Sequence, residues 1–285
     1  MVHLNFDFNC LDLTILEVIN LLAIGLSSFN MKNQVPSDIP EHGQFIEGDN
    51  LKSQEYLQKI NQWTENHKMQ ISEKKTKAMI FNFTENYQFA TRLSLKQNNI
   101  EVVNQMKILG TIINTQLSWD DNCSAIITKV NARMQLIREL QNFGASNEDM
   151  THFWILFCRS VLEQSCVVWG TSLTQENKND LERTQKTFCK LVLKEKYKNY
   201  ENAILKLNLD TLENRRKELI LRFAKNGIKK NTLNGLFPLS DKKHVMNKRS
   251  NDKYTVDFAF TDRMKNGSVI AMQKLLNEDA KNPGI

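Results

Sequence analysis

A row of basic residues in the middle of the chain has the spacing to bind a phosphate backbone. Lys129 and Arg133, with Arg138 further along, fall on successive turns of one expected helix. Cations on neighbouring turns can face a duplex, and about three phosphate contacts would make log K fall against log salt with a slope of roughly −3. The alternative is that these charges only solvate the helix face opposite Ile126 and Val130.

A short segment upstream could also contact a phosphate. Lys107 stands two residues before Leu109, and Gly110 follows. Glycine permits a positive φ or a close backbone approach, and a lysine ammonium can bind a phosphate. The segment therefore predicts either a phosphate-binding turn or an ordinary hairpin turn with a structural glycine.

Thiol and imidazole chemistry has little support in the sequence. The five cysteines form no Cys-x-x-Cys pair, none has a histidine at zinc-finger spacing, and the five histidines are dispersed. We expect reduced thiols, buried as small hydrophobes, in an intracellular protein of the nucleus or cytoplasm. The four tryptophans and the segment Phe153–Phe157 are expected in the core, because no exposed aromatic alternates with basic residues.

Alternating helix and strand signals surround the Lys107 segment. A helix is expected over 51–68, where apolar residues recur near a 3.6-residue period. Strands are expected over 78–83, 92–95, 100–103 and 110–114, with a hairpin turn at 96–99. Before them we expect an irregular leader (1–10), a short strand (13–16), an apolar helix (18–28) and a Pro/Gly-containing loop (31–50).

Only helices are expected from residue 120 onward. Asp120 or Asp121 caps the first, which carries the basic row. Ser146, with Asp149 three residues later, imitates a capping box and starts a helix that runs to about Trp169. Further helices are expected from Thr174, over 211–229 after an Asp210 cap, and over 268–277, whereas 241–253 is expected to be loose.

Charge is distributed unevenly along the 285 residues, whose formal net charge is +6. Residues 1–50 carry one basic and seven acidic residues, and the other 235 carry 37 basic and 25 acidic ones. A basic C-terminal part suits a polyanionic partner. The apolar stretch 11–29 contains Asp12, Glu17 and Asn20 and has neither a basic flank nor a cleavage site, so we expect no membrane span.

The order of several motifs resembles the end of the palm and the thumb of reverse transcriptases from LINE-like (non-LTR) retrotransposons. A helix ending at Trp63, then Lys74-Lys75-Thr76, a strand and Lys107-Ile108-Leu109-Gly110 resemble the end of the palm. The thumb-like motifs follow in order: Leu117-Ser118-Trp119-Asp120, the run from Arg159 to Trp169, Leu181–Lys186 and Leu207–Arg216. The resemblance covers about 11 to 277 of the chain.

The resemblance implies an RNA-directed DNA polymerase that uses magnesium, nucleotides and an RNA/DNA primer–template. Such enzymes hold two divalent metals with aspartate carboxylates, one adjacent pair coming from a Tyr-x-Asp-Asp hairpin. That hairpin matches Asn9-Cys10-Leu11-Asp12 here. Only Asp12 remains as a catalytic, metal-binding carboxylate, because Leu11 replaces the aspartate that coordinates metal in the family.

Two further positions inherit roles through the resemblance. Lys75 matches a catalytic lysine thought to protonate the departing pyrophosphate in related polymerases, although Ser72 stands where the family favours Asn. Lys107, Leu109 and Gly110 match the turn that grips the primer's 3′ end.

We therefore predict an α+β fold, a truncated polymerase palm remnant followed by a mostly α-helical thumb and a basic C-terminal extension. The expected parts are 1–50 (palm remnant), 51–119 (end of the palm), 120–230 (thumb) and 231–285 (extension). The chain begins about ten residues before the Tyr-x-Asp-Asp position, so we expect no independent catalysis, with RNA/DNA binding retained. The alternatives are an active enzyme whose N-terminal part is missing from the gene model, a binding module without chemistry, and a decayed element with no function.

Overall fold

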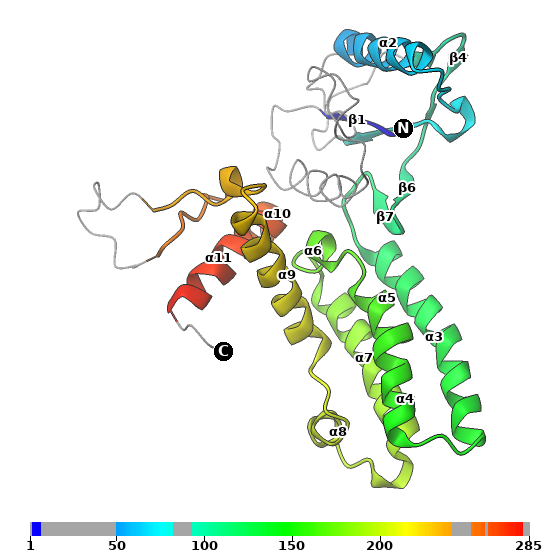
Figure 1. The fold of residues 1–285 in the computed structure, drawn as a ribbon, viewed down its shortest axis with the longest axis vertical. Coiled ribbons are helices and arrows are strands. Elements are labelled where there is room, and N and C mark those ends of the chain that lie inside the picture. The colour runs from blue at the N-terminus through cyan, green and yellow to red at the C-terminus, as the bar shows by residue number, and fades with distance from the viewer. Residues whose placement is uncertain (1, 7–49, 82–92, 241–251, 260–261, 282–285) are drawn as a thin grey trace. The chain divides into compact units, whose positions relative to one another are not determined.

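The computed structural model describes residues 2–6, 50–81, 93–240, 252–259 and 262–281. The chain forms two compact units, Met1–Ser118 and Trp119–Ile285 (Figure 1). The described strands lie in the first unit, and the second is built mainly from helices. The mixed α+β class is thus confirmed, whereas its identification with a polymerase palm and thumb stays a prediction. The expected strand 13–16, helix 18–28 and most of the loop 31–50 lie outside the described residues.

A parallel sheet of three strands centres on β2 (Lys77–Phe81), with β1 (Val2–Phe6) on one side and β5 (Glu101–Val102) on the other. Ala78 and Met79 are adjacent in sequence and both buried, as expected for a strand covered on both faces. The irregular leader expected over the first ten residues is wrong for β1. The strict apolar–polar alternation Val-His-Leu-Asn-Phe is a strand signal that the prediction missed.

Helix α2 (Asn50–Asn66) packs on a hairpin of β3 (Ser94–Leu95) and β4 (Asn98–Asn99). The side-chain amide of Gln54 donates to the Ser94 carbonyl at 2.8 Å and accepts from the Ser94 amide at 2.9 Å. An apolar cluster fills the space between them: Leu57, Ala78, Leu93, Leu95 and Ile100. The predicted helix is confirmed. The predicted turn at 96–99 is confirmed only at Lys96 and Gln97, because Asn98 and Asn99 form the unpredicted strand β4.

A second hairpin pairs β6 (Gln105–Ile108) with β7 (Thr111–Asn114). The sequence predicted β7 but not β6. Along β6 no residue is fully buried, whereas β7 buries Thr111 and Ile113. A strand with two largely solvated faces leaves a weak hydrophobic pattern, which explains the miss.

Three helical segments lie side by side in the second unit (Figure 1): α3 (Asp120–Asn142), the segment from α4 to α5, and α7 (Gln175–Leu193). Hydrogen bonds join α3 and α7 at both ends, so the two helices run in the same direction. Near their starts the Asn177 amide donates to Asp120 at 2.6 Å, and near their ends Gln141 donates to the Leu191 carbonyl at 2.9 Å.

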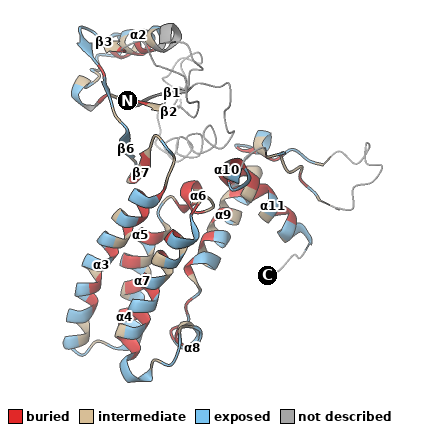
Figure 2. Ribbon diagram, turned by 180° about the vertical axis from the view of Figure 1, so that it is seen from behind, coloured by how far each residue is buried: buried red, intermediate tan, exposed pale blue. Residues whose placement is uncertain are grey.

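The core lies where the buried faces of these segments meet (Figure 2). Trp154 and Phe188 are both fully buried and stack with ring centroids 4.5 Å apart. Four residues of the predicted α3 stripe are buried: Ile126, Val130, Met134 and Ile137. The periodicity of the sequence therefore identified the correct face of α3.

The middle segment is not a continuous α-helix. α4 (Asn147–Phe153) continues as a π-helix, η3 (Trp154–Arg159), and then as α5 (Ser160–Glu163). The left-handed residue Ser165 (φ 53°) separates it from the short α6 (Cys166–Trp169). The predicted single helix to Trp169 is therefore wrong, because the wider π turn and the break depend on tertiary packing that local periodicity does not contain.

Two predicted helix starts are confirmed. Ser146 Oγ accepts from the Asp149 amide at 3.1 Å and the Asp149 carboxylate accepts from the Ser146 amide at 3.2 Å, which completes the capping box. The Thr174 hydroxyl caps α7 by accepting from the Asn177 amide at 3.2 Å. A short helix that was not predicted, α8 (Tyr200–Lys206), follows the 3₁₀ turn η4 (Lys194–Lys196).

Two other predicted caps are wrong. Thr211, not Asp210, caps α9 (Leu212–Lys229) through a hydrogen bond from the Asn214 amide to its hydroxyl. Asp120 and Asp121 lie inside the first turn of α3, where a negative charge favours the helix dipole without capping it.

The C-terminal residues are part of the same compact unit as the helices before them. The predicted last helix is confirmed as α11 (Ser268–Lys281), after η5 (Asn234–Leu236) and α10 (Asp262–Lys265). Asn277 bonds the backbone of Tyr254 twice, accepting from its amide at 2.8 Å and donating to its carbonyl at 2.9 Å. Most of the expected loose run 241–253 lies outside the described residues.

An ion-pair group joins the middle segment to α9. Arg215 makes two contacts with the Glu163 carboxylate, at 3.0 and 3.3 Å, and Arg159 approaches the same carboxylate at 3.4 Å. The three side chains are only 16 to 17 % exposed. Because one carboxylate serves two guanidinium groups, its loss would leave like charges adjacent and poorly solvated.

A buried amide makes the second polar connection. Gln185 is fully buried, and its side-chain nitrogen donates to the Tyr200 hydroxyl at 2.9 Å and to the Asp210 carbonyl at 2.8 Å. The Tyr200 hydroxyl in turn donates to the Glu182 carboxylate. These bonds fix α8 and the start of α9 against α7.

We predict that Glu163→Gln lowers the free energy of unfolding by about 2 kcal/mol, because the neutral amide cannot compensate two partly buried guanidinium groups. Urea unfolding followed by far-UV circular dichroism measures the change. Glu213→Gln is the matched control: Glu213 pairs with Lys217 at 3.0 Å, but both side chains are at least half exposed. Its effect should stay within about 0.5 kcal/mol. Equal losses in the two variants would contradict the prediction.

Four cysteines bear out the expectation of buried, reduced thiols: Cys123, Cys158, Cys166 and Cys189. Burial raises the pKa of Cys158 to about 11 and the pKa values of the other three to about 12, from 9.0. The unfolded chain therefore loses these protons at a lower pH than the folded chain does. Stability from this source is complete below about pH 9 and falls as the pH rises from 9 toward 11 to 12.

We predict a free energy of unfolding that decreases with pH above about 9. In Cys166→Ala this decrease should be shallower by up to about 1.4 kcal/mol per pH unit, since one thiol no longer titrates. Urea unfolding at intervals between pH 8 and 10.5 gives the slopes directly. Parallel pH profiles for the two proteins would show that the Cys166 thiol has an ordinary pKa in the folded state.

Candidate nucleic-acid interface

The structure describes only some of the residues to which the resemblance assigned a catalytic role. Asp12 lies outside the described residues. Lys75 ends η2 (Glu73–Lys75), directly before the central strand β2, and only its backbone is described. The Thr76 hydroxyl donates to the Ser72 carbonyl at 2.9 Å and is buried, so this threonine closes the turn. Within the described residues no group of three His, Cys, Asp or Glu side chains could hold a metal ion.

The Lys107–Gly110 segment forms the tip of the β6–β7 hairpin. Ile108 pairs with Thr111, so the loop consists of Leu109 and Gly110 alone. Their φ angles are 50° and 92°. A two-residue hairpin with positive φ at both positions is the type I′ arrangement, which normally carries Asn-Gly.

Leucine is an unexpected residue at the first position of this turn. For a side chain of this size the left-handed conformation costs about 1 to 2 kcal/mol. Leu109 is nevertheless 48 % exposed, so it contributes little to a core. Lys107, on the preceding strand, is also exposed. The tip therefore presents an apolar side chain and a cation close together in the chain.

The predicted basic row on α3 is not a single row. Lys129 is exposed, and Arg133 donates to the backbone carbonyl of Phe157 in the π segment. Arg138 lies nine residues after Lys129, which is two and a half turns, or about 180° around the helix. The buried stripe of α3 separates the two positions, and Arg138 bonds Gln135 at 3.2 Å. The three residues cannot present one face to a duplex.

The π segment brings an aromatic ring to the surface. Phe157 is 51 % exposed and stacks on Phe153 with centroids 4.8 Å apart. The expectation that the whole Phe153–Phe157 run belongs to the core is wrong for Phe157. Among the tryptophans, Trp119, Trp154 and Trp169 are buried as expected.

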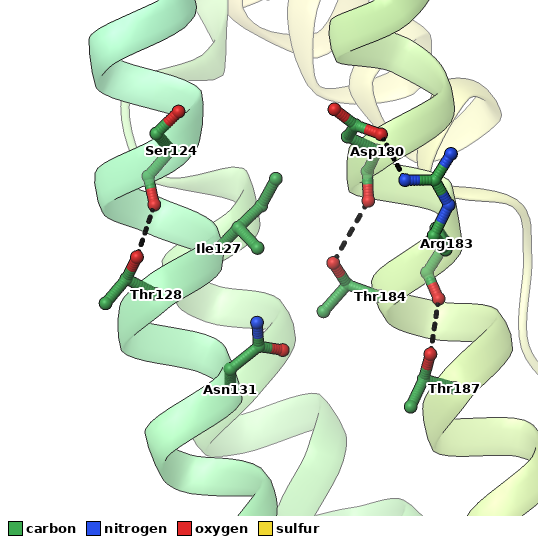
Figure 3. Close-up of a pocket in the computed structure, with 8 residues that line it drawn as sticks. All are labelled: Ser124, Ile127, Thr128, Asn131, Asp180, Arg183, Thr184 and Thr187. Atoms are coloured by element: carbon green, nitrogen blue, oxygen red, sulfur yellow. Dashed lines mark hydrogen bonds and ion pairs between the residues drawn. The ribbon is translucent and has the colours of Figure 1, made fainter.

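A groove of about 410 Å³ lies between α3 and α7 (Figure 3). Eight residues line it: Ser124, Ile127, Thr128, Asn131, Asp180, Arg183, Thr184 and Thr187. The three threonine hydroxyls donate to carbonyls of their own helices at 2.8 to 3.1 Å, so their oxygens can only accept further hydrogen bonds. Arg183 is paired with Asp180 at 2.7 Å. Ser124 and Asn131 can still donate hydrogen bonds in the groove. The charge of Arg183, its one cation, is balanced by Asp180, so the groove has no net positive charge with which to bind a phosphate.

A group of lysines after the middle of α7 escaped the sequence prediction. In the stretch Lys194-Glu-Lys-Tyr-Lys-Asn-Tyr200, lysines alternate with tyrosines. Alternation of basic and aromatic residues is typical of segments that bind nucleic acids, and this stretch has it in the sequence.

Comparison with known proteins identifies no relative. No family model matches the chain, and no curated protein or solved structure is significantly similar to it. Among the described helices, none is long and apolar enough to cross a membrane. The functional proposal therefore rests on the geometry of the described residues and on the motif resemblance.

We predict that Leu109→Asn stabilises the β6–β7 hairpin by about 1 kcal/mol, because Asn adopts the left-handed conformation at lower cost. Amide hydrogen exchange across β6 and β7 should then slow about fivefold. Leu109→Ala is the control, since alanine keeps the conformational penalty and should bring no gain. Faster exchange in Leu109→Asn than in the unaltered chain would show that the leucine side chain stabilises the turn.

Proposed function

We propose that the chain binds a primer–template nucleic acid through the tip of the β6–β7 hairpin, as a relative of LINE-like reverse transcriptases without polymerase chemistry of its own. One observation carries the proposal. An exposed leucine occupies a left-handed turn position that Asn or Gly would fill at lower cost. Strained residues that persist at exposed turns are typical of binding sites, where contact with a ligand offsets the conformational penalty.

The neighbouring residues suit the end of a nucleic-acid strand. Lys107 is exposed, and its ammonium forms no ion pair with any residue that the structure describes. A phosphate can therefore take that position without displacing an internal partner. Gly110, with φ 92°, has no side chain that would keep a sugar or base away from the backbone. Leu109 supplies an apolar contact for a sugar or base face.

Loss of polymerase chemistry follows from the residues at the Tyr-x-Asp-Asp position. Leu11 stands where the family has a metal-binding aspartate, and an aliphatic side chain offers no ligand to magnesium. Within this segment Asp12 supplies one carboxylate where the family has an adjacent pair. The proposal is therefore binding without nucleotide transfer.

Binding of a recessed RNA–DNA hybrid to the full chain tests the proposal. We predict that Lys107→Glu weakens binding and reduces the slope of log K against log salt by about 1, the share of one phosphate contact. Lys96→Glu is the matched control, because Lys96 is also an exposed lysine in a hairpin of the same unit; it lies in the turn itself, with a φ of 57°. It makes the same change in net charge.

Two outcomes would overturn the proposal. Equal weakening by Lys107→Glu and Lys96→Glu would reduce the effect to net charge. Incorporation of deoxynucleotides by the purified chain, lost in Asp12→Asn, would restore the polymerase reading.

A further inference from the structure

Six lysines form a surface that neither the motif resemblance nor the hairpin accounts for. They belong to the stretch from the C-terminal half of α7 to the end of α8: Lys186, Lys190, Lys194, Lys196, Lys198 and Lys206. We call this set the α7–α8 lysine surface. All six are exposed, and none forms an ion pair with a residue that the structure describes. Residues 186–206 contain only two acidic side chains, Glu195 and Glu201.

Aromatic rings fix two of these lysines without neutralising them. The Lys186 ammonium lies 5.1 Å from the centroid of the Tyr200 ring, and the Lys190 ammonium lies 5.7 Å from that of Tyr197. Burial and the hydrogen bond to Glu182 raise the pKa of Tyr200, so its ring remains a neutral phenol. A cation over a neutral ring keeps its full charge for an outside partner while losing part of its freedom.

The backbone between α7 and α8 is also fixed. The Lys206 ammonium donates to the Lys196 carbonyl at 3.2 Å, which ties the end of α8 to η4. Gln185 holds Tyr200 from the other side at 2.9 Å. The cations therefore extend from a folded support, and the entropy lost when a ligand orders them is reduced.

The spacing of the lysines favours one kind of polyanion. Lys186 and Lys190 are four residues apart on α7, about 6 Å along its axis, and Lys194 follows directly after the last residue of the helix. Phosphates in one strand of a B-form duplex advance by only about 3.4 Å along its axis. A single strand can extend to match the longer step, and Tyr197, between Lys196 and Lys198, adds a half-buried ring on which a base can stack.

We propose that the α7–α8 lysine surface binds the phosphodiester backbone of single-stranded nucleic acid. The proposal shares with the hairpin only the class of ligand. It uses none of the hairpin's residues, and it stands if the hairpin fails its own test. The α3–α7 groove beside it contributes no cation, because its one arginine is already paired with Asp180.

The test is binding of a 20-nucleotide oligothymidylate to the full chain by fluorescence anisotropy. The variant Lys194→Glu, Lys196→Glu, Lys198→Glu should lose at least about tenfold in affinity at low salt, and its salt slope should shrink by about 2, which is about 0.7 per lost contact for a single strand. These side chains make no internal contact that the structure describes, so the fold should be unaffected, and thermal unfolding checks this.

A control of equal charge change comes from the same unit. Lys229, Lys265 and Lys274 are likewise exposed and without an ion pair to a described residue. Their triple change to glutamate should reduce affinity less than threefold. A further variant, Lys186→Gln with Lys190→Gln, should weaken binding by an intermediate factor.

Three results would overturn the proposal. Equal losses in the two glutamate triples would leave only net charge. Tighter binding of a 20-base-pair duplex than of the oligothymidylate would assign the surface to duplex. Binding to phosphatidylserine vesicles that depends on the same three lysines, with none to oligothymidylate, would assign it to an anionic membrane surface. The variant Lys194→Glu, Lys196→Glu, Lys198→Glu leaves Lys107 and Leu109 intact, which separates this site from the hairpin.

Discussion

The carboxylate of Glu163 is the interaction on which the helical unit depends. It ends the middle segment and neutralises Arg159 on its own segment and Arg215 on α9. Arg215 also forms an ion pair with Glu218 at 2.5 Å. The Glu163 carboxylate therefore also orients the face of α9 that carries Glu218. Helices meet in this unit mainly through apolar packing, which tolerates rotation and sliding. A two-point contact between a guanidinium and a carboxylate does not, and it therefore fixes the register of α9.

Because α9 is fixed in this way, the segment that carries the lysines is also held in place. α9 begins directly after Asp210, whose carbonyl accepts from Gln185, and Gln185 also bonds Tyr200 on α8. The interior of this unit also contains a guanidinium with an unsatisfied hydrogen bond. Arg216 is only 3 % exposed, and its Nη2 has no hydrogen-bond partner among the described residues. Burial lowers the pKa of Arg216, and the Glu182 carboxylate opposes this shift. A side chain at Gly170 would clash first with the Cys166 carbonyl oxygen, 2.5 Å from the added Cβ, and would also press on the Arg216 side chain, whose Cδ lies at 3.3 Å.

Local patterns predicted the elements of this chain better than their relations. The stripe of α3, the capping box at Ser146 and the strand β2 depend on neighbours within a few residues, and all three were found. Two of the thumb-like motifs contain Glu163 and Arg215. No local pattern, however, indicated that these two residues, 52 positions apart, would meet. The missed π segment and the missed break at Ser165 have the same origin. The misplacement of Arg138 does not, because the 100° step of a regular helix already places it opposite Lys129.

The candidate site was predictable to a similar extent. Lys107, Leu109 and Gly110 were expected at a turn. Leu109 and Gly110 form it and Lys107 lies on the preceding strand, but the type I′ geometry became evident only from the φ angles. The lysine surface could have been predicted from the alternation that follows α7. What the sequence could not indicate is that tyrosine rings position two of the lysines, because that depends on how α8 folds back onto α7.

The π-helix has a consequence for how the chain tolerates change in length. A π turn closes its hydrogen bonds over five residues where an α turn uses four, so η3 accommodates one residue more than a regular helix would. Deleting a residue there would let the backbone relax to ordinary helix. Because η3 absorbs the extra residue, Glu163 beyond it would keep its direction toward Arg215. Deleting a residue from the regular helix α4 would instead rotate everything beyond it by about 100° and turn Glu163 away from α9, so the irregular turn is a place where this segment can change length without losing its ion pair.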